Sequence, residues 1–78
     1  MSADNYLYVA PRGKRFAIVM RFASDDETLR IRRDERSWEE FDSPVAAVAR
    51  AHALCREEVV EYGVCLHPKV LEALGGAS

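Results

Sequence analysis

Two histidines and two cysteines lie within one short stretch of the chain and could together hold a zinc ion. His52 and Cys55 are three residues apart, which places them on one face of a helix, and Cys65 and His67 follow shortly afterwards. Zinc favours nitrogen and sulfur ligands of this kind. The spacing matches no familiar zinc motif, however, and such side chains on an apolar helix face usually serve packing. We therefore predict no metal and no cofactor.

The same cysteines could act as nucleophiles only beside a base and a group that stabilises an oxyanion. We expect Cys55 to be buried, and the chain contains no Cys-x-x-Cys pair and no glycine-rich phosphate loop around its isolated Gly13. In a reducing compartment both thiols should stay free, and a Cys55–Cys65 disulfide would need an oxidising one. These observations indicate a protein that is not an enzyme.

Carboxylates form the second group of chemically capable residues. Residues 25–27 are three consecutive acids, and Glu39, Glu40 and Asp42 lie close together before a predicted helix. Paired acids can support acid–base chemistry, but runs of charge in turns usually face solvent. We interpret both clusters as contact surfaces for a basic partner.

Charge is divided unevenly along the chain. Residues 1–36 hold eight of the eleven Lys and Arg residues against six Asp and Glu, whereas residues 37–78 hold three against seven. The formal net charge is only −2. A basic half followed by an acidic half predicts two surfaces of opposite charge, available to different partners.

Strands are predicted in the basic half, where Phe16, Ile18, Met20 and Phe22 occupy every second position. We expect strands at residues 6–9, 15–22 and 28–33. A fourth segment, 38–41, is either a short strand or an extended lead into the helix, and a turn at residues 11–14 predicts a hairpin. The outer face of this sheet would carry a row of arginines: Arg21, Arg30 and Arg32.

Helices are predicted in the acidic half. Ser43 is a suitable N-cap, Pro44 suits the first helical position, and Gly63 marks the end of a helix over residues 43–62. A short second helix is expected over residues 69–74. The helical period places one set of side chains on the core side: Val45, Val48, Ala49, His52, Cys55, Val59 and Tyr62.

Leu54 does not fit this helical pattern. It lies on the predicted polar side, among Arg50, Glu57 and Glu61. Either the C-terminal segment covers it, or it centres a contact with a second copy of the chain or with another protein.

These elements predict a single α+β domain over residues 1–78, an antiparallel three- to four-stranded sheet packed on one main helix plus a short C-terminal helix. A chain of this length builds a small core, so oligomerisation would help to stabilise it. No run of residues is apolar enough to span a bilayer and no secretory signal is evident, so we expect a cytoplasmic protein. The predicted core comprises Leu7, Val9, Phe16, Ile18, Met20, Phe22, Leu29, Ile31, Val45, Val48, Cys55, Val59 and Tyr62.

Residues 13–21 and 41–47 together resemble the three-strands-then-helix pattern of AP2-type and integrase arm-binding domains. The resemblance implies a small nucleic-acid-binding module that uses its basic sheet face, which would include Arg12, Lys14 and Arg15 of the turn. Acids that flank the arginines, and the net charge of −2, weaken attraction to DNA. Pairing of the arginines with acids across the sheet is the alternative.

In size, layout and clustered acids, the chain is also similar to the anti-CRISPR proteins of phages and mobile elements. That resemblance implies a non-enzymatic inhibitor in a host cell that occupies a CRISPR effector, a ribonucleoprotein complex, and blocks recognition of target DNA. A homodimer is a further possible partner arrangement. The predicted partner-binding residues are Asp25, Asp26, Glu27, Asp34, Glu35, Glu39, Glu40, Arg30, Arg32, Leu54, Glu57 and Glu61.

Overall fold

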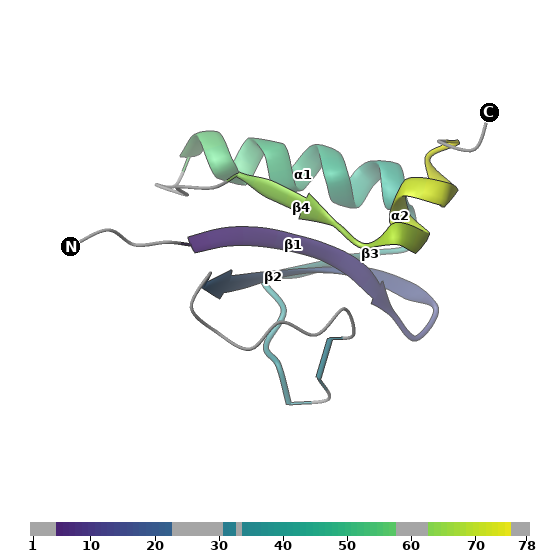
Figure 1. Cartoon of the computed structure of the whole chain (residues 1–78), viewed down its shortest axis with the longest axis horizontal. Coiled ribbons are helices and arrows are strands. Elements are labelled where there is room, and N and C mark those ends of the chain that lie inside the picture. Colours follow the sequence, from purple (N-terminus) through teal and green to yellow (C-terminus); the bar gives the residue numbers. More distant parts are fainter. Residues whose placement is uncertain (1–4, 23–30, 33, 58–62, 76–78) are drawn as a thin grey trace.

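A computed structural model describes residues 5–22, 31–32, 34–57 and 63–75. It is built around a four-stranded sheet with the strand order β3-β2-β1-β4, and its main helix lies along one face of that sheet (Figure 1). The elements are β1 (Asn5–Arg12), β2 (Arg15–Phe22), β3 (Glu39–Phe41), α1 (Pro44–Glu57), β4 (Val64–Leu66) and α2 (Pro68–Ala73). The predicted α+β class, with one main and one short helix, is confirmed.

The predicted hairpin is also confirmed. β1 and β2 pair antiparallel along their whole length, from Asn5 opposite Phe22 to Arg12 opposite Arg15. Gly13 closes the turn with a φ of 63°, in the left-handed region where side chains beyond glycine are strained. β3 then pairs antiparallel with β2, so the uncertain segment before the helix is a short strand.

The fourth strand differs from the prediction. β4 pairs parallel with β1, placing Leu7 opposite Val64, so the sheet is mixed rather than wholly antiparallel. The expected strand over residues 28–33 lies mainly outside the described residues, and its described members Ile31 and Arg32 belong to no strand. Three residues are too few for a recognisable alternation, which explains why β4 could not be predicted.

α1 begins as expected but packs through a different face. The Ser43 Oγ accepts a hydrogen bond from the Ala46 N–H at 3.4 Å, which confirms the N-cap. The buried residues are Ala47, Ala51 and Leu54, whereas Val45 is 62% exposed. The predicted core side was therefore wrong for Val45, Ala49 and His52, which are exposed, because small alanines on the neighbouring side allow the helix to lie close to the sheet.

The main core lies between α1 and the sheet. It joins Leu7, Val9 and Ile18 to the buried face of α1 and to Val70 of α2, and Leu54 belongs to it. Phe16, Met20, Val48 and Cys55 pack around its edge, as predicted. Phe22 is 44% exposed, so its assignment to the core was wrong. Residues Leu29, Val59 and Tyr62 lie outside the described part of the chain.

A second cluster covers the opposite face of the hairpin. It contains Tyr6, Tyr8, Ala10, Ala17, Val19 and Ile31. The described parts of the segment between β2 and β3 cross this face, on the side away from α1 (Figure 1). The hairpin is therefore buried on both sides, and the open basic outer face expected from the alternation was wrong. No helix in the described ranges is long and apolar enough to cross a membrane.

Candidate partner-binding surface

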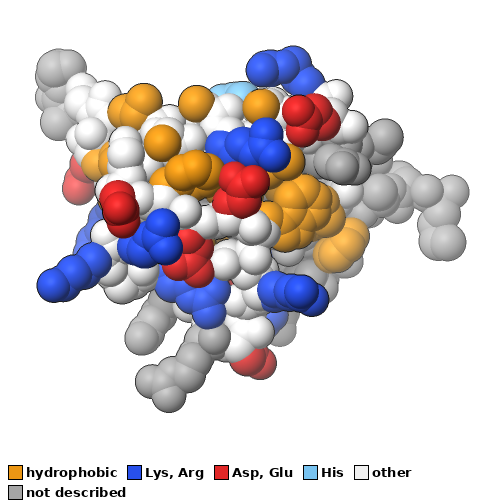
Figure 2. Space-filling model, turned by 180° about the vertical axis from the view of Figure 1, so that it is seen from behind, with side chains coloured by type: hydrophobic (Ala, Val, Ile, Leu, Met, Phe, Trp, Pro, Cys, Tyr) orange, Lys and Arg blue, Asp and Glu red, His pale blue; other side chains and the backbone are white. Residues whose placement is uncertain are grey.

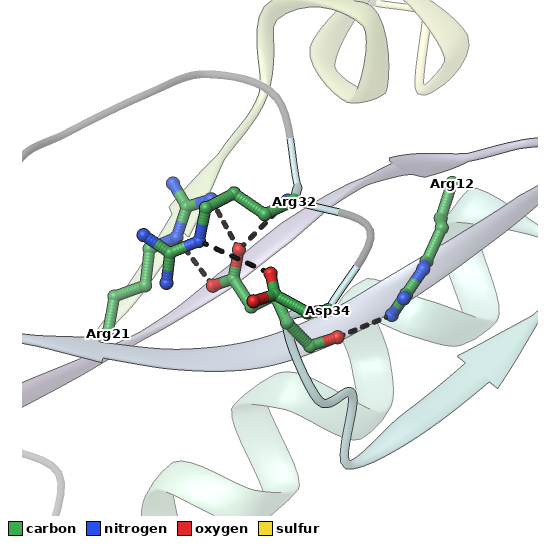
Figure 3. A network of polar contacts seen from close by, with 5 residues as sticks. Arg12, Arg21, Arg32 and Asp34 are labelled. Atoms are coloured by element: carbon green, nitrogen blue, oxygen red, sulfur yellow. Dashed lines mark hydrogen bonds and ion pairs between the residues drawn. The ribbon is translucent and has the colours of Figure 1, made fainter.

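A nearly buried ion pair fastens the covering segment to the sheet. The Arg21 guanidinium donates from Nε to Glu35 Oε2 and from Nη2 to Glu35 Oε1, both at 3.0 Å (Figure 3). The two side chains are only 11% and 10% exposed. The guanidinium carbon also lies 4.4 Å from the centre of the Tyr8 ring, a cation–π arrangement. Arg21 is thus held from two directions within the chain.

Further bonds fix the backbone around Glu35. The Arg32 N–H donates to Glu35 Oε1 at 3.2 Å, and Arg12 Nη1 donates to the Glu35 carbonyl oxygen at 2.8 Å. Arg32 and Asp34 form a more open ion pair at 3.9 Å, with side chains 67% and 91% exposed (Figure 3). Glu35 therefore receives bonds from three arginines and has a structural role.

The electrostatics of this network favour its charged form. The hydrogen bond from Arg21 lowers the pKa of Glu35 against the opposing effect of burial, and the bond from the Arg32 backbone adds to the lowering. The same hydrogen bond raises the pKa of Arg21. Burial raises the pKa of Tyr8, opposed by the Arg21 charge. The Tyr8 phenol is therefore protonated at neutral pH beside this ion pair.

A second set of ion pairs surrounds β3. Arg50 Nε donates to the two carboxylate oxygens of Glu39 at 3.1 and 3.2 Å, and its Nη1 lies 3.8 Å from Glu57. Arg15 donates to Asp42 at 3.1 Å and to the Glu40 carbonyl oxygen at 3.0 Å. Arg15 of the basic half therefore meets the acidic half, in line with the alternative that arginines pair with acids within the chain, whereas Arg50 binds acids of its own half.

Charges are consequently interspersed on the surface rather than separated. On the face shown in Figure 2, Lys and Arg side chains lie next to Asp and Glu side chains. Glu40 accepts from the Ser37 hydroxyl at 2.9 Å and lies 4.0 Å from Arg12, so it too is engaged. On this face the charges do not separate into the two surfaces of opposite charge that the sequence predicted.

The predicted partner-binding residues thus fall into three groups. Glu35 is nearly buried and Leu54 is buried, so little of either side chain is exposed to solvent. Half-buried Glu39 and Glu40 form ion pairs, and the exposed residues Arg32, Asp34 and Glu57 form longer ones. The remaining ones lie outside the described residues: Asp25, Asp26, Glu27, Arg30 and Glu61.

A groove beside β3 is the feature that the charge pattern did not reveal. It has a volume of about 460 Å³ and opens to solvent, and Trp38 has the largest side chain among its lining residues. Trp38 is 42% exposed although it directly precedes a strand, and its backbone N–H is held by the Ile18 carbonyl oxygen at 2.8 Å. The other lining residues are Arg36, Ser37, Glu39 and Leu54. In the sequence, the chain's single tryptophan was the residue that could have indicated this binding groove.

None of the cysteines or histidines lines this groove. Cys55 is half-buried and burial raises the pKa of its thiol, whereas Cys65 is exposed, and both thiols are free. His67 caps α2, with its Nδ1 accepting from the Lys69 N–H at 3.0 Å. Within residues 5–22, 31–32, 34–57 and 63–75, no three His, Cys, Asp or Glu side chains gather as metal ligands.

No family model, curated protein or solved structure matches this chain. Its function must therefore be inferred from its own geometry.

Proposed function

We propose that this protein is a non-enzymatic binding protein that occupies the surface of a macromolecular partner in the cytoplasm of a host cell. The observation that carries the proposal is the open groove at β3, walled by a tryptophan that is 42% exposed. Tryptophan is enriched among the few residues that supply most of the binding energy in protein interfaces. Its ring offers a large apolar area while the indole N–H can still donate a hydrogen bond.

The surroundings of the groove suit a protein partner. Arg36 and Glu39 place opposite charges beside the ring, and Ser37 adds a hydroxyl. An apolar centre with a polar margin is the usual composition of a protein interface. Side chains of a partner could therefore contact Trp38 while polar groups around it fix the orientation.

Nucleic acid is the less favoured partner because the arginines needed for it are engaged. Arg21 is nine-tenths buried against Glu35, and Arg15 and Arg50 bind acids at 3.1 Å. A phosphate backbone would have to displace those carboxylates, which repel it. Affinity for DNA should accordingly be low even at low salt.

The sharper form of the proposal is an inhibitor of the anti-CRISPR type. In this form the exposed acids Asp34 and Glu57 would face the basic DNA channel of an effector complex, while Trp38 anchors the contact. Inhibition would follow from occupancy, since a bound protein prevents target DNA from reaching the guide.

The test compares two single variants in a DNA-cleavage assay with purified effector complexes. Trp38→Ala should weaken binding and inhibition by about 30-fold, the effect of losing an interface hot spot. Leu71→Ala is the matched control, because Leu71 is 50% exposed on α2, outside the groove, and its loss should change neither. Circular dichroism establishes that both variants fold.

Three results would contradict the proposal in different ways. Equal inhibition by the Trp38 and Leu71 variants would remove the groove as the contact. Binding without inhibition of any effector would leave a binding protein but reject the anti-CRISPR form. Binding to duplex DNA that weakens steeply with salt would favour a nucleic-acid module instead.

A further inference from the structure

The outward side of α1 carries few charges for a surface helix. Its solvent-facing residues over the first three turns are Val45, Ala46, Ala49 and His52, all exposed. Val45 alone leaves 62% of its surface in water. The first charged residue on this side is Arg56, in the last turn. Figure 2 shows small hydrophobic side chains along the upper margin of the molecule, over α1, with blue and red side chains at the right-hand end.

This apolar face lies opposite the helix side that packs on the sheet. Ala47, Ala51 and Leu54 already bury the inner side of α1. Apolar residues on both sides are typical of a helix that packs between two partners, and a solvated helix normally has a charged outer side. This pattern points to a second packing partner for the outer face, and no residue of that face lines the Trp38 groove.

The charges at the two ends of this face complement each other. Asp42 lies two residues before the first residue of α1; its side chain is 90% exposed at the N-terminal end, while its Oδ1 accepts from Arg15 Nε at 3.1 Å. Arg56, seven residues after Ala49, is exposed at the C-terminal end. When two copies of α1 lie antiparallel and cross at Ala49, the end of one helix that carries Asp42 lies beside the end of the other that carries Arg56. Antiparallel helices also align their dipoles favourably.

The apolar residues between those charges match under the same symmetry. Val45 and Ala53 are each four residues from Ala49, so each valine meets the small alanine of the other helix. The crossing point itself is an alanine, which permits axes about 8 Å apart. A two-fold interface must be complementary to itself, and this face satisfies that condition in both shape and charge.

We propose that a second copy of this chain packs against α1 through the outer face of α1, antiparallel and about a two-fold axis at Ala49. The proposal goes beyond the binding function above and involves a different surface. A helix of 14 residues is about 20 Å long, so the contact is smaller than a standard interface of roughly 1,600 Å². The dimer should therefore dissociate in the micromolar range.

The first experiment measures mass by sedimentation velocity up to about 1 mM, where even weak specific association is detectable. Wild-type protein should change from monomer to dimer as its concentration rises. Ala49→Glu should keep it monomeric, because two carboxylates would meet on the axis. Lys69→Glu on α2 is the control for an added acid and should still dimerise. A monomeric wild type at every concentration would overturn the proposal, as would a dimeric Ala49→Glu variant.

The second experiment tests the geometry by cross-linking in a background with Cys55→Ala and Cys65→Ala. Ala49→Cys should form an intermolecular disulfide on mild oxidation, since the two copies of that position meet. Val45→Cys should not, because the two copies of position 45 are offset by eight residues, about 12 Å. Efficient cross-linking of the Val45 variant alone would refute the antiparallel arrangement.

A charge exchange supplies a third readout. Asp42→Arg or Arg56→Asp alone should weaken the dimer about tenfold, and the double variant should restore it. Failure of the double variant to recover, with both single variants folded, would reject the pairing. None of these variants touches Trp38, so failure of dimerisation is distinguishable from failure of the binding function.

Discussion

Replacing Glu35 by alanine is expected to lower the free energy of unfolding by about 3 kcal/mol, although Glu35 lies in an irregular segment. The variant leaves the Arg21 guanidinium, which is 11% exposed, without its carboxylate partner. Breaking a buried ion pair by removing one member costs about 3–5 kcal/mol. We expect the lower end of this energy range because the Arg21 guanidinium keeps its contact with the Tyr8 ring, whose centre is 4.4 Å away.

That loss is large for a domain of this size. A chain of 78 residues should have a total stability of about 4–12 kcal/mol. A change of 3 kcal/mol corresponds to a fall in melting temperature of about 12–24 °C. Thermal and urea unfolding followed by circular dichroism would measure both quantities.

Asp42→Ala is the matched control. It removes a carboxylate from an ion pair of similar length, 3.1 Å, whose side chains are 50% and 90% exposed. Because water screens such a pair, the variant should lose less than about 1 kcal/mol. The reasoning is wrong if the two variants prove equally stable. A double variant, Arg21→Met with Glu35→Leu, should recover most of the loss, since apolar residues can replace a buried pair.

Two further predictions follow from burial and charge. Because the pKa of Glu35 is held below its usual value of 4.5, its contribution to stability is present above that pH and is lost as the pH falls through the lowered pKa. Glu35→Gln should therefore flatten the acid limb of a stability-against-pH curve, and an unchanged limb would contradict this assignment. Leu54→Ala should cost about 2–5 kcal/mol, as Leu54 is 7% exposed in the main core, whereas Val45→Ala should cost less than about 1 kcal/mol. If urea unfolding shows that Leu54→Ala and Val45→Ala lower the free energy of unfolding by similar amounts, the packed face of α1 has been misassigned.

Local patterns in the sequence were sufficient to predict the elements that depend on interactions between residues close together in the chain. Alternation over residues 15–22 predicted β2, Gly13 predicted the hairpin, and Ser43 with Pro44 predicted the start of α1. Each depends on backbone conformation or on a hydrogen bond between near neighbours. The α+β class followed from the order of those elements.

Tertiary packing decided which faces are covered. α1 has two weakly polar sides, and only contact with Leu7, Val9 and Ile18 selects the side with Ala47, Ala51 and Leu54. Helical periodicity ranks side chains by hydrophobicity. It does not take into account that small alanine side chains allow the helix to lie closer to the sheet. That choice buries Leu54 and leaves Val45 in solvent.

The pairing of charges likewise could not be predicted from the sequence. The uneven division between the two halves is present in the sequence, yet Arg21 meets Glu35 and Arg50 meets Glu39 only after folding. These partners are separated by 14 and 11 residues, beyond the reach of helical or turn spacing. The sequence by itself determined how many charges of each sign the chain holds and which elements carry them. The tertiary structure alone decided that many of them bind one another, because ion pairing depends on distance in space.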